Sequence, residues 1–461
     1  MILSVILAAG EGTRMKSKLP KVVHKICGKP LLNHVIDSAE EAGIEKNVVV
    51  VGHKADKVKE IVKSDNIIYV NQPVGDNDPY GTGFAVMQAQ DHIEDDSYVV
   101  ILCGDTPLIK SETIKEFVEY HKAGNYEATV LTAEVEDPTG YGRIVRDEND
   151  QVIAIVEQKD ATEEQRKITE INSGVYCFKG KNLKSILGKL DNNNSQQEYY
   201  ITDAIEILNK EEFKVGGYKI SGHEEIQGIN SKIQLAEAEK IMRKRINTSL
   251  MAEGAIIIDP DNTYIESDVK IGRDTVIYPG VILEGKTEIG EDCIIGQNTR
   301  ISNSKIEDRV EIQSSTILDS KVDNDTKVGP YAYLRPNSDI GKNVKIGDFV
   351  EVKNAKINDG SKASHLSYIG DAEVGKNVNI GCGVVFVNYD GKNKNKTIVE
   401  DNAFIGCNVN LISPVTVKEN AYIAAGSTIT EDVEEKSLSI ARVKQVNKEN
   451  WVEKKGLLKN K

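Results

Sequence analysis

The spacing of hydrophobic residues changes near residue 251 and divides the chain into two parts. In the first part, short apolar runs at 2–7, 47–53 and 98–105 predict buried parallel strands, and the amphipathic stretch 29–43 predicts a helix that ends at Gly43. Alternating strands and helices are typical of an α/β sheet with helices on both faces. Ligands bind such sheets beyond the carboxyl ends of the strands, so we expect a site where the first and third runs end.

The second part repeats an aliphatic residue every six positions, often with a glycine directly after it. The repeat is regular over three stretches: Ile265, Ile271, Ile277, Leu283, Ile289, Ile295 and Ile301; Val328, Leu334, Ile340, Ile346 and Val352; Val399, Ile405, Leu411, Val417, Ile423 and Ile429. This pattern predicts a parallel β-helix in which each aliphatic side chain points into a shared core. Residues 231–251 contain no proline or glycine and predict one helix between the two parts.

Two segments interrupt the repeat, at 353–368 (KNAKINDGSKASHLSY) and 387–398 (VNYDGKNKNKTI). The core of a β-helix does not need such loops, and insertions on one face commonly bind ligands. The predicted organisation is therefore an α/β domain at 1–226, a linking helix at 227–251, and a β-helix domain with a C-terminal tail at 252–461.

Composition narrows the class of protein. The net charge of −14 argues against nonspecific binding to nucleic acid or to a membrane surface. The apolar runs are too short to span a bilayer, and the N-terminus has neither the basic region nor the cleavage site of a signal peptide. The six cysteines form no C-x-x-C pair, so we expect no zinc site and no disulfide framework, and we expect a cytoplasmic location.

The loop after the first run, LAAGEGTRMKSKLPK at 7–21, resembles two phosphate-binding patterns without matching either. Met15 stands where both the dinucleotide fingerprint and the nucleotide P-loop need a glycine. The loop is therefore either a phosphate loop of a third kind or a plain glycine turn with solvated cations.

Asp105 follows the strand predicted at 98–105 and would face this loop. A carboxylate there is a natural Mg²⁺ ligand for a nucleotide, with a turn cap before Pro107 as the alternative. Arg14 and Lys21 could neutralise triphosphate charge, although each alone could equally be a surface cation.

His365 lies among small polar residues in the first interruption and could be a general base near neutral pH. Arg335 and Lys353 could together hold a phosphate. The alternative for all three is an ordinary surface position.

With these features together, the chain is similar to a known family. The 7–21 loop resembles the signature loop of sugar-nucleotide pyrophosphorylases, and the whole chain, through the hexapeptide repeats to the tail, resembles the bifunctional N-acetylglucosamine-1-phosphate uridylyltransferases/glucosamine-1-phosphate N-acetyltransferases. The resemblance implies an N-terminal Rossmann-like nucleotidyltransferase domain and a left-handed parallel β-helix of hexapeptide repeats.

For uridylyl transfer, the resemblance implies that Arg14 and Lys21 are catalytic and that Asp105 and Asn230 bind Mg²⁺. The substrate-binding residues that it implies are Leu7, Ala8, Ala9, Gly10, Lys21, Gln72, Gly81, Thr82, Cys103, Gly104, Gly140, Glu157, Asn172 and Asn230.

For acetyl transfer, the resemblance implies that His365 is the general base and that Glu351 helps to orient it. Glucosamine 1-phosphate would be bound by Arg335, Lys353, Tyr368, Asn379, Asn388 and Tyr389. Acetyl-CoA would be bound by Cys382, Asn388, Tyr389, Cys407, Ala425 and Arg442.

The implied enzyme makes UDP-N-acetylglucosamine for peptidoglycan and lipopolysaccharide synthesis. It acetylates glucosamine 1-phosphate from acetyl-CoA, then joins N-acetylglucosamine 1-phosphate to UTP and releases pyrophosphate. The family also implies a homotrimer that shares acetyl sites between neighbouring β-helices. A monofunctional pyrophosphorylase with a non-catalytic β-helix, and a β-helix scaffold without catalysis, are the alternatives.

The chain departs from the family pattern in one spacer and at three cysteines. The spacer 73–80 (PVGDNDPY) is longer than usual, Cys103 stands where the family often has tyrosine, and Cys382 and Cys407 stand where alanine and serine are expected. Two thiols beside a thioester site suggest that thiol reagents inhibit acetyl transfer more than uridylyl transfer.

Overall fold

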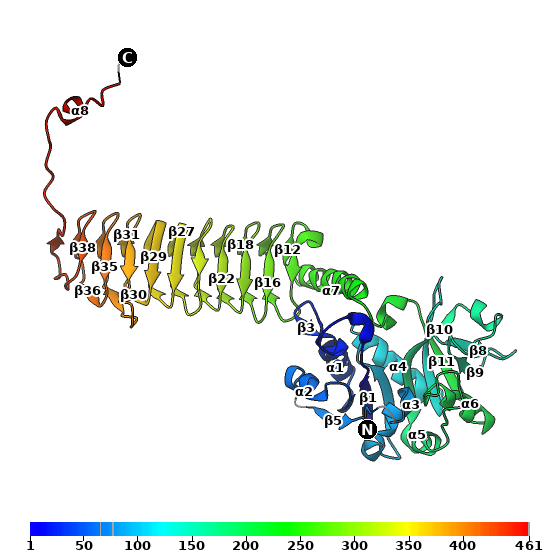
Figure 1. Cartoon of the computed structure of the whole chain (residues 1–461). Helices are drawn as coiled ribbons and strands as arrows, with labels where there is room; N and C mark the ends of the chain where they lie inside the picture. Colours follow the sequence, from blue (N-terminus) through cyan, green and yellow to red (C-terminus); the bar gives the residue numbers. More distant parts are fainter. Residues whose placement is uncertain (65, 76–77, 460–461) are drawn as a thin grey trace. The chain divides into compact units, whose positions relative to one another are not determined.

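The computed structural model describes residues 1–64, 66–75 and 78–459, which form two compact units, Met1–Met242 and Arg243–Lys461 (Figure 1). The boundary between the units falls within α7 (Lys232–Ala252), in the segment where the sequence predicts a single helix.

The first unit is built on a mixed sheet with the strand order β11-β7-β10-β6-β1-β4-β5. Its strands are β1 (Ile2–Ala8), β4 (Lys46–Val51), β5 (Ile67–Asn71), β6 (Tyr98–Cys103), β7 (Ala128–Glu134), β10 (Glu170–Lys179) and β11 (Val215–Ile220), joined by the hairpin of β8 (Arg143–Arg146) and β9 (Val152–Val156). The three strands predicted from apolar runs, β1, β4 and β6, are parallel, which confirms the α/β prediction. β10, in contrast, runs antiparallel to β6 and β7.

Helices cover both faces of this sheet, because alternate strand residues are buried on opposite sides. The first face, with Ile6 and Val49, packs against α1 (Leu31–Glu41), α2 (Ala55–Ile61) and α4 (Ser111–Ala123). The second face, with Val5 and Val48, packs against α3 (Thr82–Met87), α5 (Gly180–Leu187) and α6 (Asp203–Lys210). A short hairpin, β2 (Lys25–Ile26) and β3 (Lys29–Pro30), precedes α1.

The strand order places the expected ligand site. The chain runs from β1 to β4 and β5 on one side and then returns to β6 on the other side of β1. The loops that follow β1 and β6 therefore diverge from a switch point, which is where open α/β sheets bind ligands.

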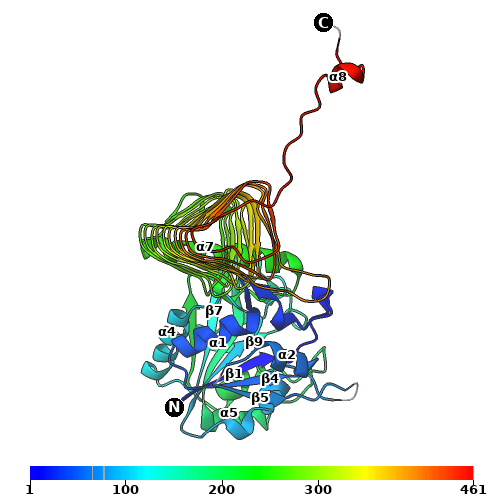
Figure 2. The same ribbon diagram turned by 90° about the vertical axis from the view of Figure 1, so that its left-hand side faces the viewer.

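The second unit is a parallel β-helix with three strand faces per coil, seen nearly end-on in Figure 2. Two faces form one 19-stranded sheet. Its strands are β12 (Ile256–Ile257), β13 (Tyr264–Ile265), β15 (Val276–Ile277), β16 (Ile282–Glu284), β18 (Ile294–Ile295), β19 (Arg300–Ser302), β21 (Glu311–Ile312), β22 (Thr316–Leu318), β24 (Lys327–Val328), β25 (Tyr333–Leu334), β27 (Lys345–Lys353), β29 (Lys362–Gly370), β31 (Asn379–Ile380), β32 (Val385–Val387), β34 (Phe404–Ile405), β35 (Asn410–Ile412), β37 (Tyr422–Ile423), β38 (Thr428–Ile429) and β39 (Leu438–Ser439).

The third face is a 9-stranded sheet. Its strands are β14 (Lys270–Ile271), β17 (Glu288–Ile289), β20 (Lys305–Ile306), β23 (Lys321–Val322), β26 (Asp339–Ile340), β28 (Lys356–Ile357), β30 (Ala372–Val374), β33 (Thr397–Val399) and β36 (Val415–Val417). Nearly all of the repeated aliphatic residues form one continuous core, as the six-residue period predicts. Beyond the last coil lies an exposed tail with the short helix α8 (Trp451–Lys454).

The sequence predicts an interruption of the repeat at 353–368, and this prediction is wrong. The segment carries β28 and most of β29, and its repeat positions Ile357 and Ala363 are each 1% exposed. Ile357 lies five residues after Val352 instead of six, and Ala363 is too small to stand out as a core residue. A search for an aliphatic residue at every sixth position therefore misses both. His365 therefore lies on a regular strand. The second interruption is confirmed, because residues between β32 and β33 leave the coil and form a hairpin-like loop with a bridge between Tyr389 and Lys394.

Candidate active sites

A cavity of about 280 Å³ opens at the switch point of the first unit. The structure gathers most of the predicted uridylyl-site residues around it. The lining residues are Leu7, Ala8, Ala9, Gly10, Lys21, Val22, Gln72, Tyr80, Gly81, Thr82, Ala85, Cys103, Asp105 and Glu198. Residues 76–77 of the long spacer lie outside the described residues.

Lys21 and Asp105 form an ion pair at one side of this cavity. The ammonium of Lys21 also donates a hydrogen bond to Asn230 Oδ1 at 3.0 Å. The amide of Ile229 donates to the carbonyl of Asp105 at 2.9 Å, which fixes the chain that carries Asn230. One carboxylate oxygen and one amide oxygen thus meet at a single cation position.

Two glycines allow the backbone around the cavity to take its shape, one in the 7–21 loop and one directly before α3. Gly12 has a φ of +66°, and a Cβ there would lie 2.7 Å from the Cβ of Lys21. Gly81 has a φ of +118° and lies against the backbone of Tyr199. A Cβ on Gly10, in contrast, would meet nothing within 4 Å, so the end of β1 stays open to a ligand.

Two residues of the 7–21 loop, Arg14 and Met15, do not line the cavity. Met15 is 1% exposed, so the side chain that replaces a P-loop glycine is part of the packed interior. Arg14 is exposed and lies outside the residues that line the cavity.

Cys103 lines the cavity where β6 ends. Its thiol donates to the carbonyl of Gly174 at 3.5 Å, and burial raises the pKa of this thiol to about 12. The Cys103 side chain is therefore a neutral wall of the site. Gly104 donates its amide to the carbonyl of Leu7 at 2.9 Å, which joins the segment after β6 to the end of β1.

The residues predicted to bind the sugar lie near each other beside β8, β9 and β10. A Cβ on Gly142 would lie 3.4 Å from the Cβ of Asn172 and 3.5 Å from Glu157 Oε1. Burial raises the pKa of Glu157. Gln158 Oε1 accepts from the amide of Gly140 at 3.2 Å and thereby holds the third predicted residue of this group.

In the β-helix, the predicted base and three predicted acetyl-CoA residues form one column along a corner of successive coils. β27 and β29 each run round this corner. Register pairs Asp348 with His365, while Cys382, Cys407 and Ala425 each lie two residues beyond the mutually paired Ile380, Ile405 and Ile423. The amide of Gly426, next to Ala425, donates to the carbonyl of Cys407 at 2.8 Å. Arg442 lies near the end of the column, with its Cδ 3.8 Å from the Cβ position of Gly426.

His365 is not oriented by Glu351. Its Nδ1 bonds Asp348 Oδ1 at 2.7 Å, whereas Glu351 Oε1 accepts from Arg335 Nη1 at 2.9 Å. The sequence prediction assigned the wrong carboxylate to the imidazole, since side-chain pairing between coils depends on the register of β27 and β29.

A second cluster lies where β27 and β29 end. The Asp371 carboxylate accepts from Lys353 at 3.0 Å, from Asn354 at 2.6 Å and from Asn388. Burial acts to raise the pKa of Asp371, but these three donors hold it below its usual value. The Asn388 amide also donates to the Tyr368 hydroxyl at 3.4 Å. Three predicted sugar-site residues, Lys353, Tyr368 and Asn388, therefore meet around one carboxylate that the sequence did not single out.

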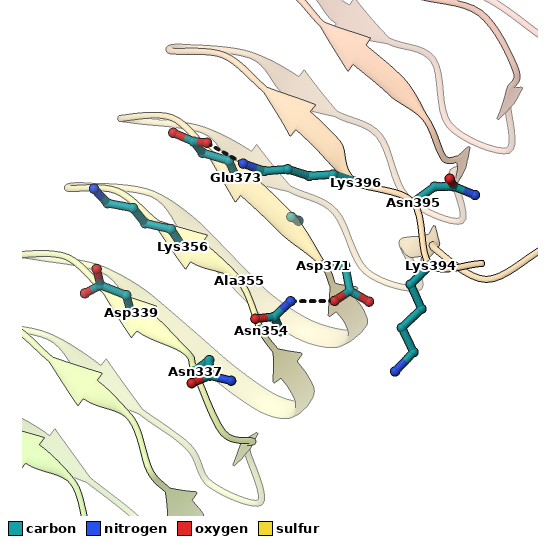
Figure 3. Close-up of a pocket in the computed structure, with 11 residues that line it drawn as sticks. Asn337, Asp339, Asn354, Ala355, Lys356, Asp371, Glu373, Lys394, Asn395 and Lys396 are labelled. Atoms are coloured by element: carbon teal, nitrogen blue, oxygen red, sulfur yellow. Dashed lines mark hydrogen bonds and ion pairs between the residues drawn. The ribbon is translucent and has the colours of Figure 1, made fainter.

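Lys394 is a further cation of this cluster that the sequence analysis missed. It comes from the insertion loop, and the neighbouring Lys353 ammonium lowers the pKa of Lys394, with Arg335 acting in the same direction. Figure 3 shows Lys394 beside the Asn354–Asp371 pair, at the edge of a polar cavity of about 500 Å³. Arg335 pairs with Glu351 and Lys353 with Asp371, whereas no ion pair of Lys394 is found among the described residues.

Two predicted residues lie apart from these contacts. Asn379 is on β31, where it pairs with Lys362 on the coil face before the corner. Tyr389 is 57% exposed on the insertion loop and donates its hydroxyl to the carbonyl of Gly391 at 2.7 Å.

The fold and these clusters define the class as a nucleotidyltransferase joined to a hexapeptide-repeat transferase. Residues 3–222 match the nucleotidyl transferase family model, residues 268–303 the bacterial transferase hexapeptide (six repeats) and residues 319–437 the GMPPB C-terminal domain. The chain is 61% identical over 452 residues to the bifunctional protein GlmU of Clostridioides difficile, covering 98% of this chain and 97% of the relative. It is 55% identical to that of Alkaliphilus metalliredigens (98% and 98% covered) and 59% identical to that of Acetivibrio thermocellus (99% and 98%).

The chain belongs to the bifunctional GlmU family. It is an enzyme with two transferase activities, one in a nucleotidyltransferase domain and one in hexapeptide acetyltransferase repeats. In the part of the chain that the structure describes, no helix is both long and apolar enough to cross a membrane.

Proposed function

We propose that this enzyme makes UDP-N-acetylglucosamine in two steps on two separate sites. The β-helix transfers the acetyl group of acetyl-CoA to glucosamine 1-phosphate. The first unit then joins the resulting N-acetylglucosamine 1-phosphate to UTP and releases pyrophosphate. The observation that carries the proposal is the convergence of Arg335, Lys353 and Lys394 on the same β-helix that bears the His365 column.

In the uridylyl step, the sugar phosphate is already ionised and needs no general base. The site must position it in line with the α-phosphorus of UTP and offset negative charge. Leu7 to Gly10 present backbone to the nucleotide, and the Lys21 ammonium would bind the phosphoryl group. Glu157 and Asn172 would hold the acetamido sugar.

A divalent metal, which we take to be Mg²⁺, fits the oxygens of Asp105 and Asn230. These two oxygens already share one cation, the Lys21 ammonium, and Mg²⁺ in nucleotide sites is held by one or two protein oxygens together with phosphates and water. When bound, the ion would offset charge on the triphosphate, and Lys21 would then be free to contact the transferring phosphoryl group.

In the acetyl step, the amine of glucosamine 1-phosphate attacks the thioester carbonyl, so that a C–N bond forms, the C–S bond breaks and CoA leaves. His365 would take the proton of the amine through Nε2, because Nδ1 is already bonded to Asp348. The phosphate would replace like-charge repulsion among Arg335, Lys353 and Lys394 with ion pairs. Acetyl-CoA would lie along Cys382, Cys407 and Ala425 with Arg442 beyond them.

We further propose that the protein is a homotrimer. Tyr331, Phe349 and Leu366 are 62%, 58% and 59% exposed at the corner that carries the His365 column. The rings of Tyr331 and Phe349 stack with centroids 5.6 Å apart, so they present one flat apolar strip. Such a strip beside an open catalytic column is suited to a second copy of the chain. The cytoplasmic location remains a prediction from the cysteine pattern.

Product analysis of one reaction mixture tests the proposal. Purified protein is incubated with glucosamine 1-phosphate, acetyl-CoA, UTP and Mg²⁺, and the products are identified by mass spectrometry. UDP-N-acetylglucosamine with free CoA and pyrophosphate is expected. Unchanged glucosamine 1-phosphate would contradict the acetyl assignment and favour a pyrophosphorylase whose β-helix is not catalytic.

A further inference from the structure

Asp348 is the carboxylate that the structure attaches to His365. The two residues are register partners on the adjacent parallel strands β27 and β29, and Asp348 Oδ1 lies 2.7 Å from His365 Nδ1. Both strands turn the coil corner at the next residue, Phe349 and Leu366, which have φ values of +57° and +37°. The dyad is thus set by the stacking of two consecutive coils.

The corner conformation is costly for these side chains. Left-handed backbone in a bulky residue costs on the order of 1–2 kcal/mol. Other coils place Asn298, Gly383, Asn408 and Gly426 in the left-handed conformation at this corner, residues that adopt it readily, and one coil places Tyr331 there with a φ of +59°. Bulky residues in this conformation therefore occur in three consecutive coils, and two of them, Phe349 and Leu366, directly follow the members of the dyad.

The bond determines which nitrogen can act as a base. The contact with the imidazole lowers the pKa of Asp348, so its carboxylate is ionised near neutral pH and can only accept a hydrogen bond. The proton of neutral His365 is therefore held on Nδ1, and the lone pair of Nε2 faces away from Asp348.

Neighbouring groups do not take over this role. Glu351 is bonded to Arg335, and Lys345 acts on Asp348 by its charge. On the other side of His365, the next coil places Cys382 at the same corner position. Among the described residues, Asp348 is the carboxylate that pairs with His365.

We propose that Asp348 is a positioning residue for acetyl transfer, which holds His365 with Nε2 toward the substrate amine and stabilises the imidazolium formed when the proton is taken. The inference rests on the proposed role of His365 as the base. Asp348 itself touches neither substrate.

The test compares Asp348→Asn, Asp348→Glu and His365→Ala in the full-length enzyme. Asp348→Asn keeps the shape but removes the charge, so kcat for acetyl transfer should fall on the order of tenfold. The KM values for glucosamine 1-phosphate and acetyl-CoA should stay within about twofold of wild type, as expected for a group that touches neither substrate. Asp348→Glu keeps the carboxylate and should recover part of kcat.

Rescue by the conservative variant separates positioning from a structural role. A role that is only structural would not be restored by the longer carboxylate of Asp348→Glu, and it would not confine the loss to kcat. Asp325→Asn is the matched control, since Asp325 is an exposed carboxylate of the same β-helix that pairs with Arg309. It should leave the rate of acetyl transfer unchanged. Uridylyl transfer in each preparation reports that the first unit is folded and gives the amount of intact enzyme.

Three outcomes are distinguishable. If Asp348→Asn keeps the wild-type kcat while His365→Ala is inactive, the positioning role is overturned and the proposed function stands. If only KM rises, Asp348 binds substrate and the inference is wrong. If His365→Ala retains full acetyl transfer, the base assignment fails and the inference fails with it.

Discussion

Asp203, the first residue of α6, carries a proton to unusually high pH. Burial raises its pKa to about 6, with Asp191, Glu206 and Asp160 adding to the shift. In the unfolded chain it would ionise near the ordinary pKa of about 4. Between these values the folded state binds the extra proton, so this carboxyl group makes folding less favourable as pH rises from about 4 to 6.

Asp203→Asn should remove this pH-dependent penalty. Relative to wild type, the variant should gain about 1 kcal/mol in free energy of unfolding between pH 4.5 and pH 7.5, a value reduced from the full shift because the group is only partly buried. Urea unfolding at both pH values measures the difference. An equal wild-type-to-variant difference at the two pH values would show that Asp203 titrates normally.

The sequence could identify those site residues that follow a predicted strand directly or belong to a recognisable motif. Gly10, Lys21 and Asp105 follow strands in a recognisable order, and the structure gathers them at one cavity. Asp348 and Asp371 could not be found in this way. Their partners lie one coil away, and coil length varies: Ile277 pairs with Ile295, Ile301 with Ile317 and Ile346 with Ala363.

Among the elements, the insertion loop between β32 and β33 contributes Lys394 to the proposed phosphate site. The substitution Lys394→Ala should raise the KM for glucosamine 1-phosphate about tenfold, because it removes a charge-assisted contact with the phosphate that is worth about 1.5 kcal/mol or more. Lys392→Ala in the same loop is the matched control and should change little. Steady-state kinetics of acetyl transfer measures both. Equal effects of the two variants would mean that the loop, rather than Lys394, matters.

The corner of the β-helix presents two exposed thiols, Cys382 and Cys407, in the column that begins at Asp348. Iodoacetamide should therefore inhibit acetyl transfer more than uridylyl transfer, because each adduct fills the proposed acetyl-CoA site. Acetyl-CoA should protect, and the double variant Cys382→Ala/Cys407→Ser should resist. Parallel loss of both activities without protection by acetyl-CoA would refute this placement of the site.

The elements themselves were largely predictable. A six-residue aliphatic period leaves few alternatives to a β-helix, and three apolar runs gave β1, β4 and β6. The antiparallel β10 was not predicted, since strand direction depends on pairing across the sheet rather than on local pattern. The error at 353–368 has a similar cause: one five-residue step and a small core residue, Ala363, hide a regular coil.

At the scale of the whole molecule, the apolar strip of Tyr331, Phe349 and Leu366 predicts self-association. Tyr331→Asp should place a charge in the interface and convert the proposed trimer to monomer, with loss of acetyl transfer and retention of uridylyl transfer. Light scattering after size-exclusion chromatography measures the mass. Ile398→Asp, at an exposed position of the third face, is the control. A wild-type monomer, or an unchanged mass in Tyr331→Asp, would contradict this use of the strip.

The central claim is that one chain carries two independent active sites, and crossed variants test it most directly. Rates of acetyl transfer and uridylyl transfer are measured separately for wild type, His365→Ala and Lys21→Met, with Lys25→Met as an exposed-lysine control. His365→Ala should lose acetyl transfer and keep uridylyl transfer. Lys21→Met should lose uridylyl transfer by on the order of a hundredfold and keep acetyl transfer. If either variant impairs both reactions equally, or neither, the assignment of two separate sites is wrong.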